Sequence, residues 1–226
     1  MRECLNLGCG TAALPGWINI DSVPYPGVDR VLDLKKGIPY RQVRFIRAEH
    51  FIEHLSPQDA LRLLGDCRAA LAADGVLRLS TPNLDWVWAS HYRPAEGRPE
   101  ADAVRDCFRL NRAFYGWGHQ FLYNLPSLVG LLRRAGFAEA QACGHGESGH
   151  PELRGLEVRD PWGGSGDECL IVEAWGTAVP PTAPWDVHAS EFRRDTDFRW
   201  HPLQYAVLWV LRGLARLFAR NRPPAP

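Results

Sequence analysis

The residue types and spacing at the start of the chain fit a binding site for an adenosine-containing cofactor. Gly8-Cys9-Gly10 ends a short apolar run, and Asp21 ends the next one, thirteen residues after Gly8. Glycine has no side chain and tolerates positive φ, so the backbone of this turn can approach a ligand closely. A carboxylate at the end of the second run can accept hydrogen bonds from a ribose diol. Together these features predict a cofactor class before they predict a reaction.

The run His50-Phe51-Ile52-Glu53-His54 also has residue types suited to chemistry, because it matches the inverted zinc-protease pattern H-x-x-E-H. On a helix, its two histidines would share one face, as metal ligands do. A third ligand on a separate helix would be needed, and no residue of the sequence stands out, so we expect no metal ligands. Glu53 and His54 then either brace the end of a strand or take part in cofactor binding. His50, nearest the strand end, is the better functional candidate.

Aromatic residues and histidines concentrate between residues 84 and 124, which we interpret as a cap or lid insert. The aromatic side chains could stack on sugar rings or on an aromatic acceptor. The alternative is that they form the hydrophobic underside of a cap over a sheet. In a later Gly-rich loop, His145, Glu147 and His150 could ligate a metal, but a solvated loop is the favoured interpretation.

Apolar runs and helix signals predict the elements that position these residues. Ser56-Pro57 followed by Asp59 is a helix start, and Asp74-Gly75 is expected to end that helix. Residues 11–17 contain Pro15-Gly16 and are too few for a full crossover helix, so the first connection is abbreviated. Strands are predicted at 4–7, 18–20, 31–34, 45–48, 76–80, 137–142 and 168–175, and further helices at 101–115 and 126–134.

Length and composition fit one soluble α/β domain with an appendage: 226 residues, 46% hydrophobic and 23% charged. Acidic and basic residues balance at 26 each, so no basic field predicts nucleic-acid binding. The six cysteines contain no C-x-x-C pair, which favours reduced thiols and a cytoplasmic location. The first strand leaves no room for a signal peptide, and a membrane-spanning helix is not expected.

The composition changes after residue 176, where prolines mark a linker. Residues 203–220 then predict an amphipathic helix with one stripe of arginines, Arg212, Arg216 and Arg220. This helix could pack back on the domain, form a homodimer, dock on a protein partner, or lie in the plane of the inner face of a membrane. We therefore divide the chain into a domain at 1–176 and an extension at 177–226.

The chain resembles the class I S-adenosylmethionine-dependent methyltransferases, and most closely the short bacterial methyltransferase type 11-like proteins associated with glycan and secondary-metabolite genes. The resemblance covers about residues 3–176. The matching blocks are Leu5–Gly10, Pro15–Asp21, Val31–Leu34, His50–Leu55, Gly75–Pro82, Ala135–Phe137 and Glu168–Ala174. The resemblance implies an α/β, Rossmann-like fold with a mostly parallel sheet, helices on both faces and an antiparallel last strand.

The resemblance also implies roles for individual residues. The Gly-rich turn would lie under the methionine part of S-adenosylmethionine, Asp21 would bind the ribose, and Asp33 would lie near the adenine. Residues 49–53 would line the mouth shared by cofactor and substrate. The cofactor-binding residues predicted in this way are Asn6, Gly8, Cys9, Gly10, Asp21, Asp33, Leu34, Glu49 and His50.

The predicted reaction is therefore O-methylation of a sugar, glycan or other small polyhydroxylated metabolite. A general base is needed only if the acceptor keeps its proton until the transition state. The candidates for catalytic residues are His119, His91 and Asp85, with His145 less favoured. One alternative is a non-catalytic interaction or scaffold protein with a methyltransferase fold. A less favoured alternative is an NAD-dependent oxidoreductase, since Gly8 to Ala13 also fits the dinucleotide pattern.

Overall fold

The computed structural model describes residues 3–159, 167–180 and 184–196. The chain divides into two compact units, residues 1–185 and 186–226. The described part of the second unit is helix α5 (Pro184–Thr196) from Asp186 onward. The amphipathic helix predicted at 203–220 lies outside the described residues. None of the described helices is long and apolar enough to cross a membrane.

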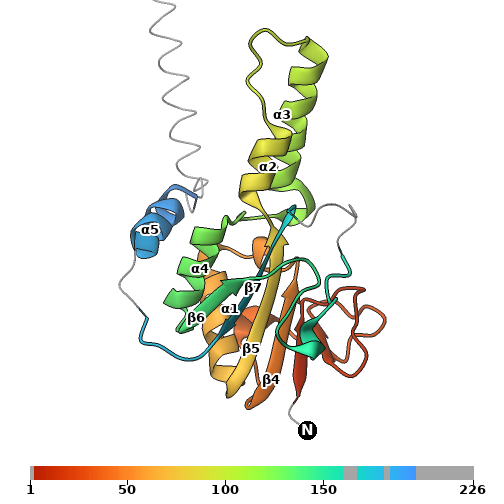
Figure 1. Cartoon of the computed structure of the whole chain (residues 1–226), viewed down its shortest axis with the longest axis vertical. Helices are drawn as coiled ribbons and strands as arrows, with labels where there is room; N and C mark the ends of the chain where they lie inside the picture. Colours follow the sequence, from red (N-terminus) through yellow and green to blue (C-terminus); the bar gives the residue numbers. More distant parts are fainter. Residues whose placement is uncertain (1–2, 160–166, 181–183, 197–226) are drawn as a thin grey trace, which may run out of the picture. The chain divides into compact units, whose positions relative to one another are not determined.

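The first unit is built on a sheet whose described strands follow the order β3-β2-β1-β4-β5-β7-β6 (Figure 1). Strand β7 runs antiparallel to both of its neighbours, and the other strands are parallel to one another. This confirms the predicted mostly parallel, Rossmann-like sheet with an antiparallel last strand. The strands are β1 (Cys4–Leu7), β2 (Ile18–Asp21), β3 (Arg30–Val31), β4 (Val43–Glu49), β5 (Leu71–Pro82), β6 (Glu139–Ala142) and β7 (Cys169–Trp175).

One face of the sheet carries the main hydrophobic core. Helices α1 (Pro57–Ala70) and α4 (Leu125–Arg134) pack on it through leucines such as Leu64 and Leu131, against strand residues such as Ile46. The predicted starts of both helices are confirmed. The Ser56 hydroxyl accepts a hydrogen bond from the Asp59 N–H at 3.1 Å, and Asn124 forms a capping box at the start of α4.

The other face of the sheet is covered by a loop, residues 144–159, instead of a long helix. The short 3₁₀ helix η4 (Pro151–Leu153) lies within this loop, and Leu153 packs against Phe45 and Val76. The connection from β1 to β2 contains no helix, as predicted, and the Asn19 side chain ties it down by accepting from Leu14 N–H at 2.7 Å. The abbreviated first crossover therefore leaves this face to the loop.

Two predicted boundaries are wrong. Helix α1 ends at Ala70, not at Asp74-Gly75, because Leu71 is already extended and begins β5. Gly75 instead lies where the β4–β5 register shifts, and a Cβ there would be 2.8 Å from the Val43 carbonyl oxygen. The strand predicted at 31–34 is only Arg30–Val31. The Asp33 carboxylate accepts from Lys35 N–H at 3.1 Å and so starts the 3₁₀ helix η1 (Leu34–Lys36).

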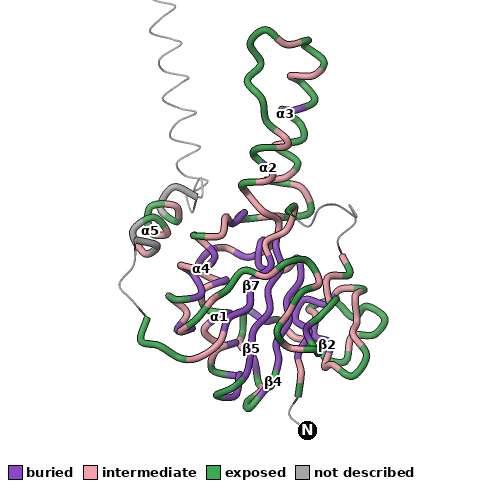
Figure 2. Tube along the Cα trace, viewed as in Figure 1, coloured by how far each residue is buried: buried purple, intermediate pink, exposed green. Residues whose placement is uncertain are grey.

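Residues 84–124 form an insert after β5 that contains a helix not predicted from the sequence. Helices α2 (Leu84–His91) and α3 (Glu100–Tyr115) lie side by side and project beyond the sheet (Figure 1). The purple buried residues gather in the strands, whereas this helix pair is mostly exposed (Figure 2), with Asp106 as the buried residue of α3. The short 3₁₀ helix η3 (Gly116–Gly118) then leads the chain back to the sheet.

Candidate active site

The predicted Gly-rich turn lies at the carboxyl ends of β1 and β2. Gly8 and Gly10 have φ angles of 59° and 50°, in the left-handed region that favours glycine. The Asp21 carboxylate accepts hydrogen bonds from the N–H of Gly10 at 2.8 Å and of Val23 at 2.9 Å. Asp21 therefore fixes the turn, and each of its oxygens keeps a further lone pair.

A buried polar network supports this turn from the loop-covered face of the sheet. The Arg47 side chain donates to Asn6 Oδ1 at 2.7 Å, to the Glu49 carboxylate and to the Leu156 carbonyl. Both Arg47 and Glu49 are 2% exposed. Asn6 in turn donates to Asn19 Oδ1 at 2.9 Å. Asn6, two residues before Gly8, is thereby linked to β2 through Asn19, and to β4 and the covering loop through Arg47.

Arg159, at the end of the described part of that loop, lies directly over the Gly-rich turn. Its guanidinium donates to the carbonyl oxygens of Gly8 at 3.1 Å and of Glu49 at 2.9 Å, and also to that of Cys9. A Cβ added at Gly10 would be 2.9 Å from Arg159 Nη2. The side chain therefore fills the space that a ligand approaching the turn would use.

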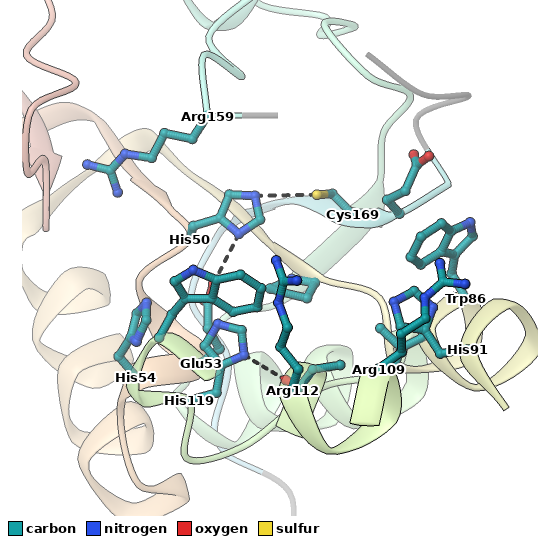
Figure 3. Close-up of a pocket in the computed structure, with 15 residues that line it drawn as sticks. His50, Glu53, His54, Trp86, His91, Arg109, Arg112, His119, Arg159 and Cys169 are labelled. Carbon is teal, nitrogen blue, oxygen red and sulfur yellow. Dashed lines mark hydrogen bonds and ion pairs between the residues drawn. The ribbon is translucent and has the colours of Figure 1, made fainter. Parts of the chain in front are cut away.

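Next to the turn is a cavity of about 470 Å³, which is within the size range of small-molecule sites. It lies at the carboxyl ends of β4 and β5, and residues of α2, α3 and η3 also line it, among them His91 and Arg112 (Figure 3). Polar and aromatic side chains dominate its lining: His50, Glu53, His54, Trp86, His91, Arg109, Arg112, Trp117, His119, Arg159, Glu168 and Cys169, together with Pro82, Val87 and Ala113.

His50 joins two residues at the mouth of this cavity. Its Nδ1 is 3.1 Å from Glu53 Oε1, and its Nε2 is 3.4 Å from Cys169 Sγ (Figure 3). Burial lowers the pKa of His50, but the hydrogen bonds to Cys169 and Glu53 outweigh burial and raise the pKa to about 10. His50 is therefore an imidazolium at neutral pH, with a proton on each ring nitrogen, and acts as a hydrogen-bond donor. Its φ of 47° is unusual for a residue with a side chain.

His54 and His119 meet because backbone hydrogen bonds join η2 (Ile52–His54) to the segment after η3. The Glu53 carbonyl accepts from Gln120 N–H at 2.7 Å, and the Gln120 side chain donates to the His54 carbonyl at 2.6 Å. The two imidazole rings lie 5.1 Å apart, edge to face. The His119 Nδ1 is 2.8 Å from the Ala113 carbonyl, which can only accept, so this nitrogen carries the proton.

His91 lies on the opposite side of the cavity, on the last turn of α2 (Figure 3). The Ser90 hydroxyl donates to the Trp86 carbonyl at 2.6 Å and is 2.7 Å from His91 Nδ1. Since the hydroxyl proton is already used, Nδ1–H donates to Ser90, and His91 Nε2 keeps a free lone pair. Burial, followed by the charges of Arg109 and Arg112, lowers the pKa of His91. His91 is therefore neutral at pH 7 and able to accept a proton.

A family model described as a methyltransferase domain matches residues 2–141, more than half of the chain. The chain belongs to this methyltransferase family. The match confirms the family indicated by the Leu5–Gly10 and His50–Leu55 blocks. A comparison with curated proteins finds no match.

Comparison with solved structures finds neighbours of low sequence identity to this methyltransferase chain. One described as a possible exported protein from Bordetella parapertussis is 13% identical, with a TM-score of 0.50 over 79% of this chain and 63% of that one. "PigF with SAH" is 16% identical, with a TM-score of 0.47 over 77% and 50%. The pyocyanin biosynthetic protein PhzM is 18% identical, with a TM-score of 0.48 over 78% and 50%. This chain thus spans about half the length of PigF and PhzM.

Within the methyltransferase fold, most of the predicted cofactor residues lie together. Three of them form the turn, namely Gly8, Cys9 and Gly10. Around it lie Asn6, Asp21 and Glu49, and His50 lines the adjoining cavity. Asp33 is exposed and caps η1, paired with Lys36 at 3.5 Å, and Leu34 is a buried member of the main core.

The predicted catalytic residues separate into two groups. His91 and His119 line the cavity, whereas Asp85 is exposed in the first turn of α2 and outside the cavity lining. His145 and Glu147 are exposed, and the His150 ring lies tilted against Phe45, with ring centres 5.4 Å apart, outside the cavity lining.

Sequence reasoning missed several residues of this site. Arg109 and Arg112 come from the face of α3 that the insert turns toward the cavity, and Arg159 comes from the Gly-rich loop. Cys169 reaches the cavity because β7 is antiparallel, so its first residue lies beside Pro82 at the carboxyl end of β5. The antiparallel direction of this strand was predicted, and it was the signal that could have placed Cys169 here.

Proposed function

We propose that this chain is an S-adenosylmethionine-dependent methyltransferase that transfers a methyl group to an oxygen of a small, polyhydroxylated acceptor such as a sugar. The observation that carries the proposal is the juxtaposition of the Gly8–Gly10 turn with the histidine-lined cavity, with Arg159 and His50 at their junction. Family membership supports the reaction type. The acceptor class is supported by the chemistry of the cavity wall.

The residues around the turn fit S-adenosylmethionine. The two left-handed glycines add no side chain to the turn and the Cys9 side chain between them is buried, while the second lone pair on each Asp21 oxygen can accept from the ribose hydroxyls. Arg159 occupies the space above Gly10, so its guanidinium must move when the cofactor binds. A guanidinium displaced from backbone carbonyls is well suited to pair with the carboxylate of the cofactor's methionine part.

When bound, the cofactor would supply an electrophilic methyl group on its sulfonium, so that an acceptor oxygen could bond to that carbon in line as the carbon–sulfur bond breaks and the neutral thioether, S-adenosylhomocysteine, leaves. The chain's own contribution is to align that oxygen in the cavity and to take up its proton. His91 is suited to the second task, because its Nε2 lone pair is free and its lowered pKa keeps it neutral at pH 7. The Ser90 hydroxyl and the Trp86 carbonyl fix the tautomer that this role requires.

The cavity wall supports a hydroxyl-rich acceptor. Trp86 and Trp117 offer aromatic faces on which a sugar ring can stack, and Arg109 and Arg112 offer several hydrogen-bond donors to hydroxyl oxygens. Arg112 also lies 4.7 Å from the centre of the Trp117 ring, which orients the guanidinium at the cavity edge. Aromatic faces beside fixed donors are a combination suited to polyols.

Calorimetry and a labelled-methyl assay test the proposal. We expect saturable binding of S-adenosylmethionine and of its demethylated product, followed by transfer of a tritiated methyl group to members of a panel of monosaccharides and disaccharides. Deoxy analogues would then identify the oxygen that is methylated. Absence of binding at millimolar cofactor would refute the proposed function. Binding with transfer to amines or thiols, and not to hydroxyls, would refute the proposed acceptor.

A further inference from the structure

Glu53, His54 and His119 bring three metal-ligating side chains together in one wall of the cavity. Their candidate ligand atoms all lie within 4.8 Å of one another, and this is the set of three found among the described residues. Two residues come from η2 and the third from the segment after η3, so the set exists only in the folded chain. From this geometry we infer that Glu53, His54 and His119 bind a divalent transition-metal ion of the Zn²⁺ class.

The donor set suits that class of ion. Two imidazoles and one carboxylate are the protein ligands of many catalytic zinc sites, which leave a further position open. Ligand atoms bound at about 2.1 Å cannot be more than about 4.2 Å apart, so a movement of less than about 1 Å per side chain would close the set. All three residues line the cavity, so the open position would face its interior.

Hydrogen bonds around the ligands hold them as outer-shell partners hold metal ligands. His119 Nδ1–H donates to the Ala113 carbonyl at 2.8 Å, which leaves Nε2 as the donor atom for a metal. The Glu53 carboxylate, 0% exposed, accepts from the Thr81 hydroxyl at 3.1 Å and contacts His50. One lone pair on each oxygen is used by these partners, and the others are available to a cation.

The backbone on both sides of the set is strained. His50 and Trp117 are two of the non-glycine residues with positive φ, at 47° and 55°, and each lies a few residues from a proposed ligand. Such conformations persist where the surrounding structure imposes them, and they concentrate at functional sites. The strain at Trp117 turns the chain so that His119 faces His54.

The sequence contained the first half of this site in the H-x-x-E-H run, but the structure changes its membership. His50 is outside the set, because its two ring nitrogens contact Glu53 and Cys169, while His119 supplies the ligand that the sequence did not nominate. The site therefore does not follow the zinc-protease pattern. Metal binding is also independent of the proposed methyl transfer, because it can be measured on the protein alone.

The test is metal binding by the full chain, stripped with a chelator and titrated with Zn²⁺ against a chromophoric competitor. We expect one Zn²⁺ per chain. His119→Ala and His54→Ala should each weaken binding at least about 100-fold, the upper end of what loss of an outer-shell partner costs. Thr81→Val, which removes a partner of Glu53 and keeps its shape, should weaken binding about 10-fold. His91→Ala, in the same cavity but outside the set, should change the affinity less than about threefold.

Co²⁺ in place of Zn²⁺ identifies the ligands by its spectrum. Nitrogen and oxygen ligands predict visible d–d bands without a thiolate charge-transfer band, and the bands should disappear in His119→Ala. Urea unfolding of each variant shows whether the fold survives, and Glu53→Gln provides a third ligand variant if one of the histidine variants does not fold. The inference is overturned by lack of Zn²⁺ binding, by unchanged affinity in the folded ligand variants, or by a thiolate band that Cys169→Ser abolishes.

Discussion

Asp21 provides the sharpest quantitative test of the cofactor site. In the structure its two oxygens accept from Gly10 N–H at 2.8 Å and from Val23 N–H at 2.9 Å. In Asp21→Asn, the amide oxygen can replace only one of them. The amide nitrogen, a donor, would then face a second backbone donor. The substitution therefore removes the negative charge offered to the ribose and loosens the Gly-rich turn, with almost no change in side-chain volume.

The expected loss can be worked out from these bonds. A hydrogen bond to a charged group contributes about 1.5–3 kcal/mol. Losing one such bond to the ribose should therefore weaken binding of S-adenosylhomocysteine about 10- to 150-fold. Loosening of the turn adds to this loss, so the lower figure is a minimum.

Isothermal titration calorimetry with S-adenosylhomocysteine measures this effect directly. Asp85→Asn is the matched control, because Asp85 is an exposed carboxylate outside the cavity, and its affinity should stay within about twofold of the wild type. Urea unfolding checks that Asp21→Asn is folded under the conditions of the titration. A folded Asp21→Asn protein with wild-type affinity would show that Asp21 does not hold the cofactor.

Three further predictions concern the base, the loop and a helix cap. Burial and two neighbouring arginines lower the pKa of His91, so the rate of methyl transfer should be constant between pH 7 and 8.5 and fall below about pH 6.5 as His91 is protonated. His91→Asn should remove this acidic decrease in rate. An unchanged pH profile in the variant would exclude His91 as the base. Arg78→Met should lower the free energy of unfolding in urea by about 3–5 kcal/mol, since it leaves Glu157 and Glu173 without their arginine partner. Adding Glu157→Gln and Glu173→Gln should restore most of this loss. A loss below about 1 kcal/mol in Arg78→Met alone would contradict the reasoning. Ser56→Ala removes the cap of α1 and should lower the free energy of unfolding by about 1 kcal/mol without changing cofactor affinity.

The parts of the fold that the sequence predicted are those governed by local signals. The Gly8–Gly10 turn, the Ser56 cap and the Ala135-Gly136 helix stop each depend on a few adjacent residues, and each lies where expected. The end of α1 was wrong because Asp74-Gly75 carries the same local signal as a helix stop. In the folded chain, Leu71 pairs with Val43 in the neighbouring strand, so β5 begins at Leu71, before Asp74-Gly75.

The cavity was predictable only in part, because its residues come together through long-range contacts. His119 reaches Glu53 through backbone hydrogen bonds between segments more than sixty residues apart in the sequence. Arg159 reaches the Gly-rich turn because the 144–159 loop folds back over the sheet. No hydrophobic periodicity within either segment predicts these contacts. The exposed position of Asp85 has the same origin, since it depends on where α2 begins.

One long-range signal was nevertheless present in the sequence. Arg47 and Arg78 interrupt the apolar runs Phe45–Ala48 and Val76–Leu79, and both point to the face of the sheet opposite the main core. A buried arginine must be paired, so each implies a polar partner brought from elsewhere. In the structure each arginine has a partner in a neighbouring strand and one in the covering loop. The loop partners are the Leu156 carbonyl for Arg47, and Glu157 for Arg78 at 2.8 Å.

The abbreviated first crossover, the buried arginines and Arg159 therefore belong to one structural solution. Without a long helix on this face, the sheet is covered by a loop that has little apolar surface with which to pack. A hydrogen bond from Arg47 to the Leu156 carbonyl and an ion pair between Arg78 and Glu157 compensate, and such contacts are directional, so they fix where the loop lies more strictly than apolar contacts would. That placement positions Arg159 over the Gly8–Gly10 turn. It follows that cofactor affinity should depend on Arg78, which touches neither the turn nor the cavity, because Arg78 pairs with Glu157 in the loop that carries Arg159.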